Sequence, residues 1–123
     1  MIKFIVEEKH AEFIFKVLTP VGISFHLVDR YSSMREFQSL VRKDMDALNF
    51  NFLPPFPQKR MFGSMDPKFL KERMDQLNHF FNVFFANSEV AQNRLVMTYF
   101  SSKLADQESM DKIAEYSAIL QQA

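Results

Sequence analysis

The stretch FIFKVLTPVGISFHLVDR, residues 13–30, decides the fold of this chain of 123 residues. It holds an apolar run at 13–18, followed at 19–22 by Thr-Pro-Val-Gly, which has proline and glycine where a tight turn needs them. Beyond the turn, Ile, Phe and Leu alternate with Ser, His and Val over 23–28. Alternation with a period of two, bounded by a turn, predicts an antiparallel β-hairpin.

Both neighbours of this hairpin extend the prediction. Upstream, Ile2, Phe4 and Val6 alternate with other residues and predict a further strand. Downstream, apolar residues recur at helical spacing through most of the chain. We therefore expect an α+β fold in which a three-stranded antiparallel sheet, about 2–30, packs on a helical half.

The expected helices are interrupted by a loop rich in proline. The first helix should begin at a capping box, Ser33 to Glu36, and carry its apolar stripe to Leu48. Three prolines forbid a helix in the loop over about 51–65. Later helices are expected over about 66–86, in a short segment from 88, after Asn93, and over about 106–121.

The composition excludes several classes of protein. Hydrophobic residues make up 47% and charged residues 24%, which is typical of a globular domain and excludes disorder for most of the chain. There is no cysteine, which excludes a disulfide scaffold and a thiolate metal site. The three histidines lack the spacing of metal ligands, and two glycines cannot form a glycine-rich phosphate loop. We expect no metal, no cofactor and no enzymatic activity.

The charges are balanced overall but unevenly distributed. Fifteen basic and 15 acidic residues give a net charge of zero, which argues against a nucleic-acid partner. Residues 30–73 carry nine basic and five acidic residues, net +4, whereas 1–29 and 74–123 are net −1 and −3. Either the middle of the chain marks an anion-binding region, or this is an ordinary variation among solvated charges.

Arg30 is the first candidate for binding an anion. It has the strand parity of Ser24 and His26, so it should face away from the apolar row at the end of its strand. A helix is expected to begin directly after it. Free amides at a helix N-terminus and the two-pronged guanidinium both favour a phosphate. Tyr31 offers a flat ring beside that anion.

Four motifs, in order, resemble those of PX (phox homology) domains. Residues 30–34, Arg-Tyr-Ser-Ser-Met, are similar to the family's Arg-Tyr-Ser-acidic-Phe run, and 54–59, Pro-Pro-Phe-Pro-Gln-Lys, to its proline loop ending in lysine. Residues 69–77 resemble the next helix, which has an arginine four residues before a core leucine. Residues 88–100 resemble the closing short helices.

The resemblance covers about residues 1–101 and implies a domain boundary and a function. A PX domain is expected over 1–103, followed by a helix at 104–123 that leads into a longer protein. PX domains bind phosphoinositides, most often phosphatidylinositol 3-phosphate on endosomal membranes. The resemblance implies a cytoplasmic, sorting-nexin-like module of protein transport that attaches peripherally to endosomal-type membranes.

Residues that match the ligand-binding positions of the family are assigned the same roles by the resemblance. The resemblance implies that Arg30 holds the 3-phosphate, Tyr31 packs beneath the inositol ring, Lys59 reaches the 1-phosphate and Arg73 hydrogen-bonds the 4- and 5-hydroxyls. Arginine can bind phosphate through two parallel bonds, whereas lysine acts as a compact charge on a flexible stem. Met61 and Phe62 would insert into the bilayer, with Arg60 as a supporting basic residue.

Asp29 departs from the family, which usually has a basic residue before the Arg-Tyr pair. Its charge is expected either to weaken the anion site or to brace a neighbouring arginine. Only Lys59, Arg60 and Arg73 stand out as further cations for the site. The sequence therefore predicts selectivity for a 3-monophosphate over more highly phosphorylated lipids.

The alternative prediction is a protein-interaction module with weak or no lipid binding. Residues Pro54 to Lys59 also fit Pro-x-x-Pro-x-Lys, a pattern that SH3 domains bind as polyproline II. The helix predicted over 106–121 could also dock a partner helix through its apolar residues, Met110, Ile113, Tyr116 and Leu120.

Overall fold

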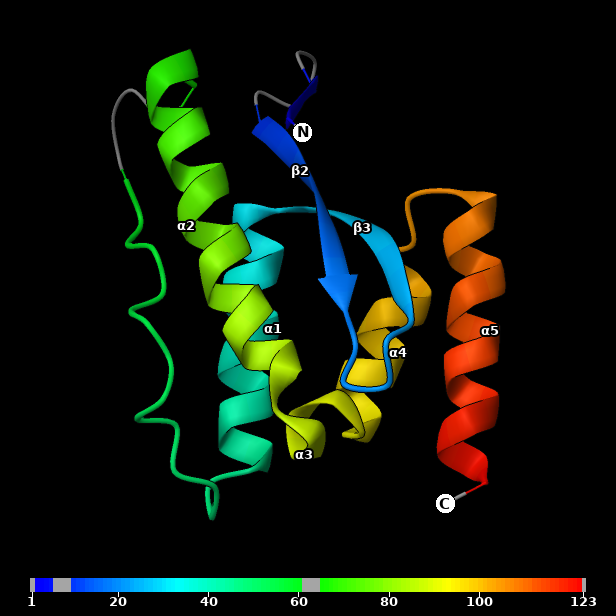
Figure 1. Ribbon diagram of the computed structural model, residues 1–123. Helices are drawn as coiled ribbons and strands as arrows, with labels where there is room; N and C mark the ends of the chain where they lie inside the picture. The colour runs from blue at the N-terminus through cyan, green and yellow to red at the C-terminus, as the bar shows by residue number, and fades with distance from the viewer. Residues whose placement is uncertain (1, 6–9, 61–64, 123) are drawn as a thin grey trace.

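The fold is α+β, as the sequence predicted, with an antiparallel sheet packed on helices (Figure 1). A computed structural model describes residues 2–5, 10–60 and 65–122. The strands are β1 (Ile2–Ile5), β2 (His10–Leu18) and β3 (Ser24–Arg30). The helices are α1 (Tyr31–Asp44), α2 (Pro67–Ala86), α3 (Ser88–Ala91), α4 (Arg94–Ser102) and α5 (Gln107–Gln121).

The sheet has the order β1-β2-β3, and its main part is the hairpin of β2 and β3. The hairpin register runs from Leu18 opposite Ser24 to Glu12 opposite Arg30. Gly22 has a φ of 86°, a conformation that L side chains rarely adopt, which explains glycine at this place in the turn. Buried and outward positions alternate along both strands, so the core face and the outer face are those that strand parity predicts.

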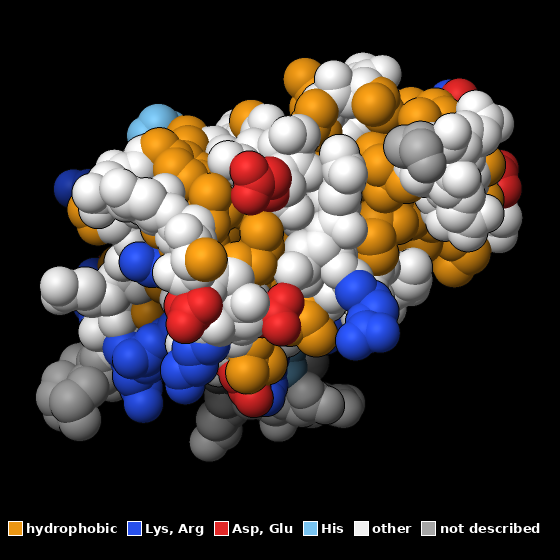
Figure 2. Space-filling view, turned by 90° about the horizontal axis from the view of Figure 1, so that it is seen from below, with side chains coloured by type: hydrophobic (Ala, Val, Ile, Leu, Met, Phe, Trp, Pro, Cys, Tyr) orange, Lys and Arg blue, Asp and Glu red, His pale blue; other side chains and the backbone are white. Residues whose placement is uncertain are grey.

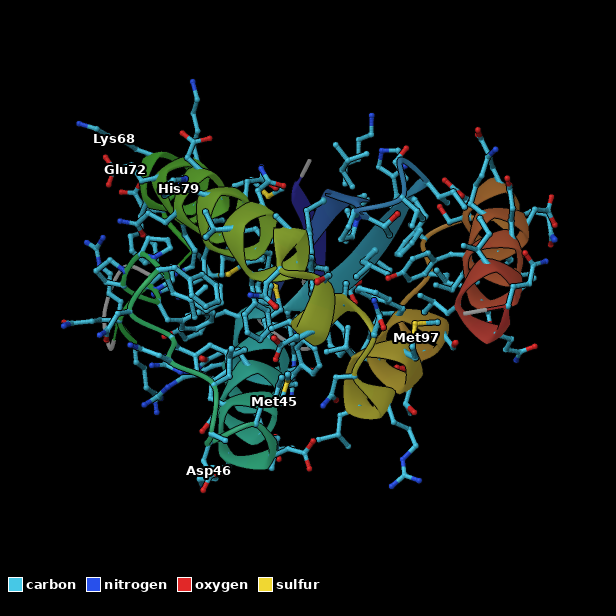
Figure 3. The ribbon with its side chains drawn as sticks, turned by 60° about the horizontal axis from the view of Figure 1, so that its bottom comes forward. Met45, Asp46, Lys68, Glu72, His79 and Met97 are labelled. Atoms are coloured by element: carbon cyan, nitrogen blue, oxygen red, sulfur yellow. The ribbon has the colours of Figure 1, made fainter. Side chains whose placement is uncertain are left out.

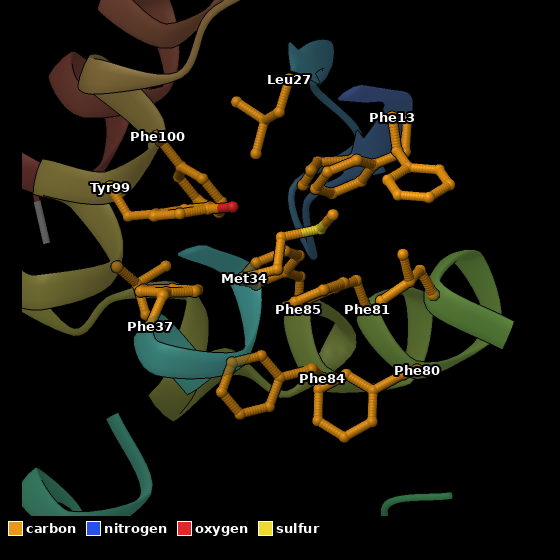
Figure 4. Close-up of a cluster of buried hydrophobic side chains, with 14 of the residues drawn as sticks. Phe13, Leu27, Met34, Phe37, Phe80, Phe81, Phe84, Phe85, Tyr99 and Phe100 are labelled. Atoms are coloured by element: carbon orange, nitrogen blue, oxygen red, sulfur yellow. The ribbon is translucent and has the colours of Figure 1, made fainter. Parts of the chain in front are cut away.

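Phenylalanine fills the core between the sheet and α2 (Figure 4). The rings of Phe15 on β2 and Phe81 on α2 stack with centroids 5.4 Å apart. Phe37 of α1 and Tyr99 of α4 stack at 3.7 Å. The apolar residues that recur along α2 at helical spacing, Leu70, Met74, Leu77, Phe81 and Phe84, are buried, and so are Phe80 and Phe85 beside them. Other elements of the fold pack against α2 on several sides. Burial of its aromatic rings stabilises the scaffold that carries the site.

The irregular segment after α1, which the structure describes as far as Arg60, runs along the outside of α1 and α2 (Figure 1). Its Phe56 ring packs edge-on against Phe80 in the core at 5.0 Å. Asp66 then caps α2, accepting hydrogen bonds from the amides of Lys68 and Phe69, and proline follows at the first helical position. This start of α2 is the one that the Asp-Pro pair predicted.

The predicted start of α1 is wrong. The helix begins at Tyr31, directly after β3, and its N-cap is Arg30 with extended dihedral angles and no side-chain cap. The capping box at Ser33 is not used, because the strand passes directly into the helix and the N-cap lies three residues earlier. The helix also ends earlier than predicted, at Asp44 rather than Leu48.

The outer edge of β3 is covered by the segment that follows α4. The amide of Val28 donates to the carbonyl of Lys103 at 2.8 Å, and the amide of Ala105 donates to the carbonyl of His26 at 3.0 Å. Ser109 of α5 accepts the amide hydrogen of His26 at 2.8 Å. These bonds and the buried side chains of α5 integrate residues 103–121 into the same core as the sheet.

The molecule presents different side chains at its two sides. On the face seen from below, hydrophobic side chains crowd the surface towards α5, and several Lys and Arg side chains gather on the opposite side (Figure 2). Within the described ranges, no helix has the length and apolarity needed to cross a bilayer.

Candidate functional site

A pocket of about 660 Å³ lies where the β3–α1 junction, the proline loop and α2 meet. Its walls include all the predicted head-group residues and the supporting basic residue: Arg30, Tyr31, Lys59, Arg60 and Arg73. They come from three separate parts of the chain, so the fold itself brings them together.

Arg30 is the last residue of β3 and points away from the core, as strand parity predicted. Its side chain is exposed and lines the pocket. Across the sheet it faces Glu12, but in the described part of the chain its guanidinium forms no ion pair. A guanidinium with its donors free in a pocket can bind an oxyanion through two bonds.

Tyr31, the first residue of α1, ties the proline loop to the helix. Its hydroxyl donates to the carbonyl of Pro57 at 2.5 Å, and its ring stacks on Phe56 with centroids 5.7 Å apart. Burial raises the pKa of Tyr31, while the cations Arg73 and Arg35 act in the opposite direction. The phenol therefore stays protonated and keeps its bond to the loop.

Arg73 is buried, with 5% of its surface exposed. Its guanidinium carbon lies 3.8 Å from the centroid of the Tyr31 ring and 4.5 Å from that of Phe69. The same group donates to the carbonyl of Gln58. Burial lowers the pKa of Arg73, with Tyr31 opposing the change and Arg60 reinforcing it.

The guanidinium of Arg73 has unused donor capacity. Its Nε is buried without a hydrogen-bond partner, and no described carboxylate forms an ion pair with it. Burying a charge without a counter-charge is costly, so this arrangement favours an anion or a set of polar oxygens in the pocket.

The two basic residues at the end of the proline loop are exposed. Lys59 lines the pocket, and the guanidinium carbon of Arg60 lies 4.3 Å over the ring of Phe69. The predicted insertion residues, Met61 and Phe62, follow directly but lie outside the described residues. Their role stays a prediction.

Asp29 has neither of the effects expected from the sequence. Its carboxylate is 3% exposed, on the core face of β3, opposite to the side that Arg30 faces. It accepts hydrogen bonds from the Tyr99 hydroxyl at 2.7 Å and from the Arg30 amide at 2.8 Å, and it pairs with Lys103 at 3.3 Å. The charge is compensated inside the fold, so it neither faces the pocket nor braces an arginine side chain.

Sequence reasoning missed part of the pocket wall. Arg35, Ser39 and Lys43 of α1 line the same pocket beyond Ser32. From Ser32 onwards these residues follow one another at intervals of three or four, which places them on one face of the helix. That periodicity was readable in the sequence. Without the fold, however, the periodicity indicates only which face of the helix is polar.

The proline segment is folded against its own domain. Pro57 is buried, its carbonyl is bonded to Tyr31, and the neighbouring Phe56 packs on the core. An SH3 domain would have to detach this segment to bind it in polyproline II form. On α5, Ile113 and Tyr116 are likewise buried in the domain. The interaction alternative is therefore not favoured.

The histidines do not suggest a metal site. His79 points away from the core on the outer side of α2, near the side on which Lys68 and Glu72 project (Figure 3). Among the residues that the structure describes, no three His, Asp or Glu side chains come close enough to share a metal ion.

Comparisons with known proteins show the family and the fold. Residues 18–103 match a family model described as the PX domain. A solved structure titled "X-ray structure of a designed CISK-PX domain" shares the fold with a TM-score of 0.63 and 20% sequence identity, over 80% of this chain and 90% of that one. No curated protein matches the sequence significantly.

Proposed function

Because this chain belongs to the PX domain family, whose members are phosphoinositide-binding modules, we propose that its pocket binds the head group of phosphatidylinositol 3-phosphate. The module would recruit the protein that contains it from the cytoplasm to endosomal-type membranes. It would bind lipid without catalysing a reaction.

The observation that carries this proposal is the buried guanidinium of Arg73. A positive charge that is 5% exposed, has an unpartnered Nε and lines a pocket with several other cations needs negative or polar oxygens. An inositol phosphate supplies both kinds, because phosphates and hydroxyls share one ring. In our assignment, Arg73 donates to the 4- and 5-hydroxyls.

The positions of the side chains support the remaining roles that we propose. Arg30 binds the 3-phosphate, since it has free donors beside the start of α1. Lys59 reaches the 1-phosphate from the loop that leads to Met61 and Phe62, so the lipid tail would point towards the insertion residues. Tyr31 supports the inositol ring with the part of its own ring that Arg73 and Phe56 leave uncovered.

Liposome binding tests the proposal. Vesicles with phosphatidylinositol 3-phosphate in neutral lipid should bind the domain, and neutral vesicles should not. The variant Arg30→Ala should lose binding, whereas Arg94→Ala, which removes an exposed arginine from α4 outside the pocket, should retain it. Equal binding by wild type and Arg30→Ala would contradict the assignment.

A further inference from the structure

The pocket is longer than one monophosphate head group requires. It continues from Arg30 along one face of α1, past Ser32, Arg35 and Ser39 to Lys43. From Ser32 to Lys43 the helix rises by about 16 Å, at 1.5 Å per residue. The groove therefore extends the head-group site along the helix for about three turns.

This extension carries positive charge that the fold does not use. Arg35 and Lys43 are exposed, and neither forms an ion pair in the described part of the chain. Glu36 is the one carboxylate among the described residues of the pocket wall. The groove thus has more cations than carboxylates to balance them.

Arg35 also belongs electrostatically to the main site. Together with Arg73 it acts to lower the pKa of Tyr31, so its charge is within reach of the phenol at the centre of the pocket. A ligand group near Tyr31 is therefore within the field of Arg35.

These donors are left over when a monophosphate is bound. The function proposed above uses Arg30 for the 3-phosphate, Lys59 for the 1-phosphate and Arg73 for two hydroxyls. Arg35 and Lys43 then have no partner. The prediction of selectivity for a monophosphate depended on a scarcity of further cations, and the structure removes that scarcity.

We propose that Arg35, supported by Lys43, forms a second phosphate subsite in this pocket. An inositol head group with a phosphate at position 3 and another at position 4 or 5 then binds more tightly than the 3-monophosphate. This inference rests on the proposed function of the pocket. The ligand chemistry is a polyphosphorylated inositol, which a membrane lipid or a soluble inositol phosphate could supply.

Calorimetric titration with soluble head groups at fixed salt tests the subsite. The probes are inositol 1,3-bisphosphate, the 1,3,4- and 1,3,5-trisphosphates, and the 1,4,5-trisphosphate as a control of equal phosphate number without the 3-phosphate. We expect one of the two 3-phosphorylated trisphosphates to bind at least tenfold more tightly than the 1,3-bisphosphate. We expect the 1,4,5 isomer to lack this gain.

Three variants identify the residue responsible. Arg35→Gln should remove most of the gain, so it should weaken binding of the favoured trisphosphate at least fivefold more than binding of the 1,3-bisphosphate. Arg35→Lys, which keeps the charge but not the two-pronged donor, should keep part of the gain. Arg42→Gln is the matched control, because Arg42 is an exposed arginine of the same helix that lies over Phe50 instead of lining the pocket.

The outcomes separate this inference from the proposed function. If the 1,3-bisphosphate binds and no trisphosphate binds more tightly, the second subsite is wrong and the proposed function stands. If all trisphosphates gain equally and Arg42→Gln matches Arg35→Gln, the surface is a diffuse basic patch and the subsite is again wrong. If the 1,3-bisphosphate does not bind, both are wrong. If a trisphosphate does bind more tightly, vesicles carrying the corresponding bisphosphorylated lipids show whether the bound ligand is the lipid or the soluble inositol phosphate.

Discussion

The guanidinium carbon of Arg73 lies 3.8 Å over the ring of Tyr31, and each of these two residues also bonds a carbonyl of the proline loop. Tyr31 holds Pro57 and Arg73 holds Gln58. The wall of the pocket and the path of the loop are therefore set by the same pair of side chains.

This relationship predicts that mutation can separate the effect of the Tyr31 hydroxyl on stability from the effect of the Tyr31 ring on head-group affinity. Tyr31→Phe keeps the ring under Arg73 but removes the bond to Pro57, so the free energy of unfolding should fall by about 0.5–1.5 kcal/mol. The affinity for inositol 1,3-bisphosphate should change little. Urea denaturation and calorimetric titration measure the two quantities.

Tyr31→Leu, in contrast, removes the surface on which Arg73 rests. A cation–π contact contributes about 0.5–2 kcal/mol, so the head-group affinity should fall roughly twofold to thirtyfold. If Tyr31→Phe loses as much affinity as Tyr31→Leu, the hydroxyl contacts the head group directly and the ring is not the supporting surface.

Arg30→Ala should weaken binding to vesicles with phosphatidylinositol 3-phosphate. Hydrogen bonds to charged groups contribute about 1.5–3 kcal/mol, which corresponds to roughly tenfold to a hundredfold in affinity. Sedimentation of the protein with vesicles over a range of lipid concentrations measures the loss. Arg94→Ala, which has the same change in net charge, should bind within about twofold of wild type.

The double variant Met61→Ser and Phe62→Ser should separate membrane anchoring from head-group recognition. Burial of a methionine or phenylalanine side chain contributes about 1.5–3 kcal/mol, so vesicle binding should fall strongly. Titration with soluble inositol 1,3-bisphosphate should give an unchanged affinity. A parallel loss in both assays would show that these side chains support the folded loop rather than enter the bilayer.

The buried contact between Tyr99 and Asp29 predicts a loss of stability at high pH. Burial and the neighbouring carboxylate raise the pKa of Tyr99 above its ordinary value of 10.0. Above that pH the unfolded chain releases the proton while the folded chain keeps it, so stability falls as pH rises. The slope from one such group approaches about 1.4 kcal/mol per pH unit.

Urea denaturation between pH 9 and 11 checks this in wild type and in Tyr99→Phe. Above pH 10 the free energy of unfolding should fall less steeply in the variant. The difference in slope should be at most that of one titrating group, about 1.4 kcal/mol per pH unit. The decline should not vanish, because burial also raises the pKa of Tyr31 and Tyr116. Identical slopes in the two proteins would mean that Tyr99 titrates alike when folded and unfolded.

The hairpin and most helix starts were predictable because local chemistry determines them. The turn at 19–22 has a glycine with positive φ, and Asp66 and Asn93 cap their helices through their own side chains. The start of α1 was not predictable in this way. There the strand continues into the helix, and a long-range contact with Tyr99 and Lys103 holds the preceding carboxylate.

The candidate site was predictable in part, because short stretches of sequence also carry its residues. The resemblance of short motifs predicted Arg30, Tyr31, Lys59 and Arg73, and the structure places all four around one pocket. The motifs could not indicate that Arg73 lies on Tyr31, nor that Asp29 pairs with Lys103. Both facts depend on contacts between residues more than 40 positions apart in the chain.

The segment that pairs with the outer edge of β3 also bears on self-association. An open strand edge is a template on which another chain can add a strand, and this is a common start of aggregation. The carbonyl of Lys103 and the amide of Ala105 already occupy that edge through Val28 and His26. Copies concentrated on a membrane could therefore meet at this edge without joining their sheets.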